Sequence, residues 1–95
     1  MLIEYTGQEI DRGIVRFTAP WCVPCKQYKP IFDGVARGFS DVDFYVIDIE
    51  SYPEIAEENG VRSIPAVFTV KDGEWLKYQQ VPSAPELADA ARLLA

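Results

Sequence analysis

Apolar and polar positions divide the chain into short segments that together predict an α/β fold. Residues 14–18 and 42–49 are rich in β-branched and aromatic side chains, which predicts two strands, the first of them buried. Between them, apolar residues recur at spacings of three and one, as on one face of an amphipathic helix. That face consists of Tyr28, Ile31, Phe32, Val35, Ala36 and Phe39. Because a strand, a helix and a strand follow one another, the two strands are expected to pair in parallel.

The segments around this unit are less regular. Residues 2–5 fit an edge strand, and residues 6–12 leave room for little more than one helical turn. Within the first helix Pro30 is expected to cause a kink, since proline lacks the N–H that a helical hydrogen bond needs. Residues 51–54 have the spacing of a capping box with a proline in the first turn, which predicts a short helix over 52–59.

The last third of the chain predicts a hairpin and a final helix. Residues 66–70 and 74–80 fit two strands, and Asp72-Gly73 between them is typical of a type I′ hairpin turn. Residues 83–86 repeat the capping-box pattern, so a last helix is expected to begin there. Its buried residues would be Leu87, Ala90 or Ala91, and Leu94. All segments together predict one sheet with helices on its faces.

Length and composition predict a single domain over residues 1–95. The chain is 48% hydrophobic and 25% charged, and it is long enough to bury one core. No apolar run approaches the roughly 20 residues that span a bilayer, and the first residues do not resemble a signal peptide. We therefore expect a cytoplasmic monomer without membrane contact. The net charge of −6 and the lack of a Lys/Arg cluster argue against nucleic-acid binding.

The chain has two cysteines and no histidine, and the cysteines lie between a predicted strand and a predicted helix. A helix N-terminus stabilises thiolate, the nucleophile of disulfide exchange, through its unpaired N–H groups and its dipole. Cys22, at the loop end, is therefore the candidate attacking thiol. Cys25, one helical turn further along, is the candidate resolving thiol. Pro24 is expected to stiffen the first turn, and Trp21 is expected to shield one side of the pair.

Two other roles for the cysteines fit the residues less well. A zinc site needs two more cysteine or histidine ligands, which this chain lacks, so only a site shared between molecules would remain. Two inert core cysteines would have no need of a position between a strand and a helix, flanked by Trp21 and Lys26. No metal and no bound cofactor are therefore expected.

Residues 17–26, Phe-Thr-Ala-Pro-Trp-Cys-Val-Pro-Cys-Lys, resemble the active-site segment of the thioredoxin family. Three further matches follow in the expected order. Pro30 lies at the family's helix-kinking proline, residues 61–66 resemble the segment that contains its cis-proline, and Asp72-Gly73 matches its hairpin. The resemblance covers nearly the whole chain after about Gly13, with a shortened N-terminal segment.

This resemblance implies a thioredoxin fold, in which a mixed sheet of four or five strands is flanked by helices. It implies the reduction of protein disulfides by the Cys22–Cys25 pair, with electrons that come from NADPH through a thioredoxin reductase. One alternative is a glutaredoxin-like electron donor to ribonucleotide reductase. Another is a binding subunit in which the fold serves without redox chemistry, since fold alone does not determine function.

The resemblance also implies a cis peptide bond between Ile64 and Pro65, although X-Pro bonds are cis in only about 5–6% of cases. Such a bond would turn the backbone of Ile64 towards the thiols, where an extended substrate segment can pair with it. It would also place a residue without an N–H beside the dithiol. The alternative is a proline that only begins the strand over 66–70.

The chain departs from the family pattern in the strand before the cysteines. Thioredoxins commonly carry there a buried aspartate, which helps to take the proton of the resolving thiol, and a lysine nearby. The matching positions here are Arg16 and Val46. Arginine stays protonated and does not act as a base, so Arg16 would act by attracting a thiolate. Alternatively, Arg16 points to the other face of the sheet or reaches a rim carboxylate such as Asp48 or Glu50.

Further departures lie along the expected docking rim. Thr18 replaces a common aromatic residue, Val23 replaces a glycine, and residues 80–82 lack the glycine found near the last strand of the family. We expect Trp21, Val23 and the Ile64–Pro65 segment to contact substrates. The identity of the partners cannot be carried over from the family, because the rim differs.

Overall fold

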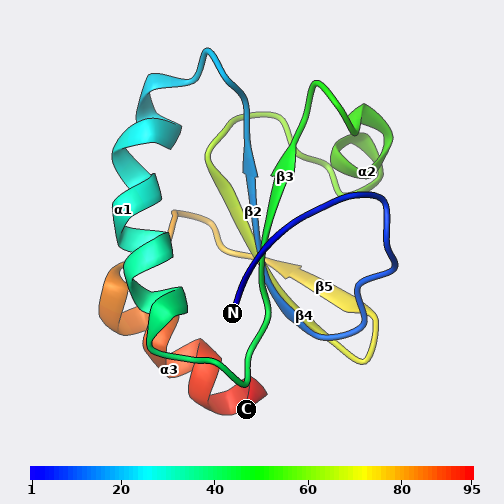
Figure 1. The fold of residues 1–95 in the computed structure, drawn as a ribbon. Helices are drawn as coiled ribbons and strands as arrows, with labels where there is room; N and C mark the ends of the chain where they lie inside the picture. Colours follow the sequence, from blue (N-terminus) through cyan, green and yellow to red (C-terminus); the bar gives the residue numbers. More distant parts are fainter.

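A computed structural model describes all residues of the chain, 1–95. It contains one five-stranded sheet with helices on both of its faces (Figure 1). The strands are β1 (Leu2–Glu4), β2 (Gly13–Thr18), β3 (Phe44–Asp48), β4 (Ala66–Lys71) and β5 (Glu74–Lys77). The helices are α1 (Val23–Arg37), α2 (Pro53–Glu58) and α3 (Ala84–Leu94). No helix is both long enough and apolar enough to cross a membrane.

The strand order is β1-β3-β2-β4-β5, and the sheet is mixed. β3 pairs in parallel with both β1 and β2, as expected for strands joined by α1, whereas β4 is antiparallel to β2 and to β5. The turn between β4 and β5 has positive φ at both Asp72 (53°) and Gly73 (76°), as a type I′ turn requires. The predicted α/β architecture, the parallel unit and the hairpin are confirmed.

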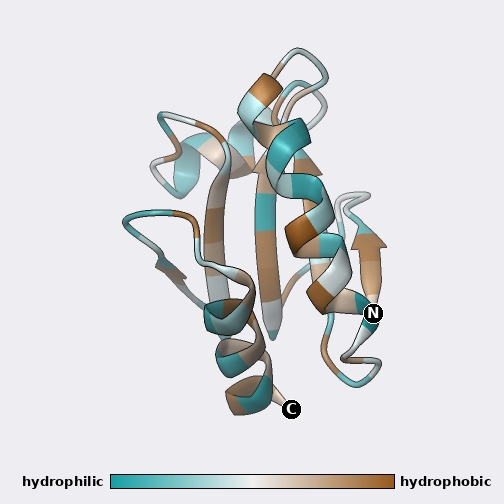
Figure 2. Cartoon of the chain, turned by 90° about the vertical axis from the view of Figure 1, so that its left-hand side faces the viewer, coloured by the Kyte–Doolittle hydropathy of each residue, from teal (hydrophilic) through white to brown (hydrophobic).

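β2 lies in the middle of the sheet and contributes to two separate cores. Consecutive residues of a strand face opposite sides, so Ile14 packs under α1 and α3 while Val15 and Phe17 pack on the α2 side. Figure 2 shows α1 and α3 lying over the same face of the sheet. Because both faces of β2 are covered, its residues from Gly13 to Phe17 are buried.

Helix α1 begins directly after the loop that follows β2. Cys22 is its N-cap, Pro24 lies in its first turn, and its last residue is Arg37. Proline suits the first turn because the N–H that it lacks would have no helical partner there. The helix continues through Pro30 as one element. This arrangement carries Cys22 and Cys25 at the end of α1 that lies beside the loops following β2 and β3.

Two details of the sequence prediction are wrong. The capping box at 51–54 does not form, because Pro53 takes the first helical position and makes Tyr52 the N-cap, without a side-chain hydrogen bond. The strand predicted over 74–80 ends at Lys77, since the chain then turns away to reach α3. Residues 6–12, which leave room for little more than one helical turn, contain no helix. By contrast, the capping box of α3 is formed in both directions between Ser83 and Glu86.

Candidate active site

Cys22 and Cys25 form a disulfide at the N-terminus of α1, with their Cα atoms 5.2 Å apart. Both residues are buried, with 4% and 1% of their surface exposed. The backbone N–H of Cys25 points at Cys22 Sγ, with an N–S distance of 3.2 Å. This N–H is in position to donate to a Cys22 thiolate once the disulfide is reduced. The first turn of α1 holds no acidic residue that would oppose such a negative charge.

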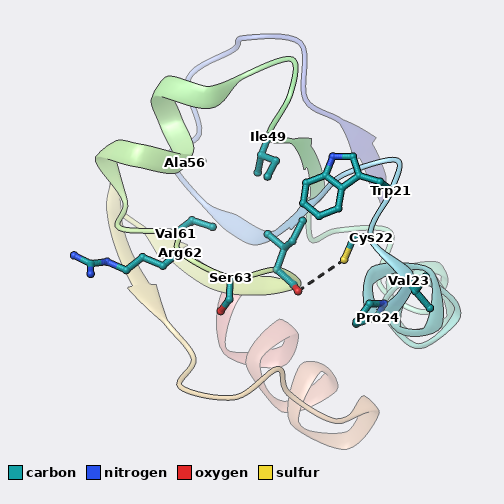
Figure 3. A pocket seen from close by; sticks show the side chains of 10 residues that line it. Trp21, Cys22, Val23, Pro24, Ile49, Ala56, Val61, Arg62 and Ser63 are labelled. Carbon is teal, nitrogen blue, oxygen red and sulfur yellow. Dashed lines mark hydrogen bonds between the residues drawn. The ribbon is translucent and has the colours of Figure 1, made fainter.

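An apolar groove of about 550 Å³ opens on the Cys22 side of the disulfide (Figure 3). Its walls are formed mainly by Trp21, Val23, Pro24, Ile49, Val61 and Ile64. Trp21 and Val23 are 62% and 60% exposed, and both lie on the rim of this groove. The indole N–H of Trp21 donates to a carboxylate oxygen of Glu50 at 2.7 Å, so the ring is held in place beside Cys22.

The segment before β4 forms the opposite wall of this groove. The Ile64–Pro65 peptide bond is cis, and the carbonyl oxygen of Ile64 lies 3.8 Å from Cys22 Sγ (Figure 3). Neither the N–H nor the C=O of Ile64 takes part in a backbone hydrogen bond. Both groups are therefore available to an extended segment lying in the groove, in the manner of an added strand.

Arg16 lies behind the disulfide, on the face of the sheet that α1 covers. It is 3% exposed, and the centre of its guanidinium lies 5.3 Å from the centroid of the Phe32 ring. Neither alternative placement is found, because the side chain is not on the α2 face and makes no ion pair with Asp48 or Glu50. Its Nε–H has no hydrogen-bond acceptor.

The charge of Arg16 is only partly compensated by its surroundings. Burial lowers the pKa of the Arg16 guanidinium, while the nearby carboxylate of Asp33 and the hydroxyl of Tyr28 raise this pKa in part. Asp33 is itself buried and forms an ion pair with Lys29, and its other carboxylate oxygen has no partner. Arginine remains protonated under these conditions. A buried positive charge therefore lies on the face of the sheet that α1 covers, at the position where the family resemblance implies an acid.

A second cavity, of about 490 Å³, joins Arg16 to Cys25. Its polar lining residues come from four elements and include Glu4, Arg16, Lys26, Lys29 and Asp48. The two sulfur atoms are thus flanked by different surroundings. Cys22 faces an apolar groove, and Cys25 borders a charged cavity on the other side of α1.

The structure brings most of the predicted site residues together. Trp21, Cys22, Val23, Pro24 and Ile64 line the groove, and Arg16 and Cys25 line the charged cavity. No three side chains of His, Cys, Asp or Glu are grouped closely enough to hold a metal ion.

Sequence reasoning missed the buried carboxylate of Asp33. One signal was present in the sequence, since Lys29 and Asp33 are four residues apart and flank the apolar face of the helix.

Comparison with known proteins supports one family. The thioredoxin family model matches residues 4–92. "Putative thioredoxin 2" of Streptomyces coelicolor is 31% identical over 93 residues, covering 90% of this chain and 69% of that protein. "Thioredoxin-1" of Schizosaccharomyces pombe is 41% identical over 61 residues, covering 64% of this chain and 59% of that protein. A mutant thioredoxin from Halobacterium salinarum is similar in structure, with a TM-score of 0.81 at 24% identity over 98% of this chain and 89% of that one.

Proposed function

Because this chain belongs to the thioredoxin family, we propose that it is a thiol–disulfide oxidoreductase that reduces protein disulfides through a reversible Cys22–Cys25 dithiol/disulfide. The observation that carries this proposal is the position of Cys22. Its sulfur lies at a helix N-cap, on the edge of an open apolar groove, and 3.8 Å from a backbone carbonyl that has no backbone partner. This combination of a helix N-cap, an open groove and an unpaired backbone carbonyl supports Cys22 as the nucleophile and the groove as the substrate site.

The reaction proceeds by two exchanges of sulfur bonds. In the first, the Cys22 thiolate attacks one sulfur of the substrate disulfide, which forms a mixed disulfide and releases the other substrate sulfur as a thiolate. In the second, Cys25 loses its proton to solvent and attacks Cys22 Sγ. The Cys22–Cys25 disulfide forms, the second substrate sulfur leaves as a thiolate, and both substrate thiolates take up protons. Two electrons have moved from the protein to the substrate.

The groove provides recognition for an extended substrate segment. The free N–H and C=O of Ile64 can pair with the substrate backbone beside its cysteine, which requires no particular side chain. The exposed indole of Trp21 and the exposed side chain of Val23 then pack on the apolar residue that neighbours the substrate cysteine. Because the main contacts are to the substrate backbone, many substrate sequences should bind. Substrates with apolar residues next to the cysteine should bind more tightly.

The oxidised protein would be reduced again by a thioredoxin reductase that uses NADPH, and the protein would act as a cytoplasmic monomer. The same groove would receive the reductase and the substrate in turn, because only one disulfide partner at a time can reach Cys22.

The test is insulin-disulfide reduction with NADPH and a thioredoxin reductase. The rate of NADPH oxidation by the reductase should rise in proportion to the concentration of the wild-type protein. Cys22→Ser should support no such oxidation. Cys25→Ser should instead accumulate a mixed disulfide with a substrate cysteine, visible as a mass increase that dithiothreitol reverses. Wild-type turnover no higher than that of Cys22→Ser would contradict the proposed function.

A further inference from the structure

Arg16 is a buried cation for which the oxidised protein supplies no ion-pair partner. Only two charged residues of the chain are buried, Arg16 and Asp33, and they do not form an ion pair with each other. Asp33 instead pairs with Lys29. The Arg16 Nε–H has no acceptor, and the guanidinium is in contact with the face of Phe32. Burying a charge that is only partly compensated is costly, and a counter-charge beside Arg16 would reduce that cost.

The cavity shared by Arg16 and Cys25 indicates where that counter-charge arises. The sulfur of Cys25 carries no charge in the disulfide, and it becomes negative only when the thiol ionises. We propose that Arg16 is a positioning residue for the redox reaction, and that it stabilises the thiolate of Cys25 as this residue resolves the mixed disulfide. This inference rests on the proposed function. It adds that a cation, Arg16, assists Cys25 at the position where the family resemblance implies a proton acceptor.

The balance of the step changes accordingly. A buried acid would accept the proton of Cys25 directly, whereas Arg16 accepts none. The proton passes to water in the open cavity, and the electron pair left on Cys25 Sγ forms the new bond to Cys22 Sγ. The bond from Cys22 Sγ to the substrate breaks, and the substrate sulfur leaves with its electron pair. Arg16 keeps its proton throughout.

Other charged groups face Cys25 and have to be weighed against Arg16. β1 contributes Glu4, β3 contributes Asp48, and α1 contributes Lys26 and Lys29 to the same cavity. These side chains reach water, so their effects on Cys25 are screened. Asp33 and Tyr28 lie deeper, beside Arg16, and the only charged residue that lines the groove on the Cys22 side is Arg62. Arg16 is thus the one buried cation of the set.

The first experiment titrates Cys25 as a single thiol. In a Cys22→Ser background, the ultraviolet absorbance of thiolate is followed against pH for the parent, Arg16→Met, Arg16→Lys and Lys26→Met. A unit charge several Å away in a partly buried site changes the thiolate fraction by about tenfold or more. We expect Arg16→Met to raise the titration midpoint by about one pH unit and Arg16→Lys to restore most of the difference. Lys26→Met, which removes an exposed cation of the same cavity, should produce less than a third of that shift.

The second experiment measures the two exchanges separately in a single turnover with otherwise wild-type protein. Arg16→Met lowers the thiolate fraction of Cys25 about tenfold, but the more basic thiolate is intrinsically about threefold more nucleophilic. The second exchange should therefore slow about threefold at neutral pH, while formation of the mixed disulfide changes less. If Arg16→Met does not fold, Arg16→Gln carries the same expectations.

These outcomes separate the inference from the proposed function. If Cys25 titrates at the same pH in the parent and in Arg16→Met, then Arg16 is not the counter-charge. The same conclusion holds if Lys26→Met shifts the Cys25 midpoint as far as Arg16→Met does. Wild-type protein would still reduce insulin in that case. If the wild-type protein does not reduce insulin, the proposed function is wrong, whatever the titration of Cys25 shows.

Discussion

Cys22 should be about half ionised at pH 7, and the Cys25→Ser variant isolates this property. The serine keeps the backbone N–H that points at Cys22 Sγ and removes the second thiol, so that a single group titrates. An ordinary thiol has a pKa of about 8.5 and is roughly 3% ionised at pH 7. A helix N-terminus and one charge-assisted hydrogen bond together stabilise a thiolate by about 2 kcal/mol, net of the cost of burial. This energy corresponds to about 1.5 pH units, so the titration midpoint should lie near 7.

The assay is the rate of alkylation by iodoacetamide as a function of pH, and it has an independent check in stability. A thiolate whose midpoint is lowered by folding stabilises the folded protein above the unfolded midpoint. That stability is lost as the pH falls through the folded midpoint. Urea unfolding of Cys25→Ser should therefore show a gain of about 2 kcal/mol between pH 6 and pH 9 that Cys22→Ser/Cys25→Ser lacks. A midpoint at or above 8.5, or equal gains in both variants, would refute the assignment of Cys22 as the activated thiol.

Three further expectations concern the support of the site. Tyr28→Phe removes a buried hydrogen bond of 2.6 Å to the carbonyl of Pro82, so thermal melting should show a loss of about 1 kcal/mol and about 4–8 °C in Tm. Hydrogen bonds at the N-cap of α3 lower the pKa of Glu86, and the stability that follows is present above the ordinary carboxylate pKa and lost as the pH falls. Glu86→Gln should therefore flatten the acid side of a plot of Tm against pH. Glu50→Ala removes the acceptor of the Trp21 N–H, and should raise KM for insulin by about two- to fivefold through loss of about 0.5–1 kcal/mol of ordering.

Local patterns were sufficient to predict most of the fold. The strand, the helix and the cysteines between them follow from periodicity and spacing, and Asp72-Gly73 needs positive φ at two positions, which identifies the turn type. The capping box at 51–54 failed because the same four letters contain a proline, whose preference for the first helical position moved the N-cap by one residue. The start of such a helix depends on the competition between the capping-box spacing and the position of the proline. The spacing alone does not decide which residue becomes the N-cap.

The placement of Arg16 could not be predicted from the pattern of β2. The neighbours of Arg16, at positions 15 and 17, are apolar, and so is Ile14, so the strand reads as buried on both faces without an alternation to orient it. Its contact with Phe32 and its closeness to Asp33 depend on how α1 crosses the sheet, which is a tertiary property. The departure from the family pattern marks the position, and only the tertiary structure shows which side of the sheet the charge occupies.

The separation of the two cavities predicts which kinetic constant Arg16 controls. Substrates reach Cys22 through the apolar groove, whereas Arg16 lies behind Cys25 and lines no part of that groove. Arg16→Met should therefore leave KM for insulin within about twofold and lower kcat when the second exchange limits turnover. The fall in kcat should diminish as the pH rises, because Cys25 then ionises without help from a cation. A change in KM with unchanged kcat would mean that Arg16 shapes the groove through the packing of α1, and that the charge itself has no part in the reaction.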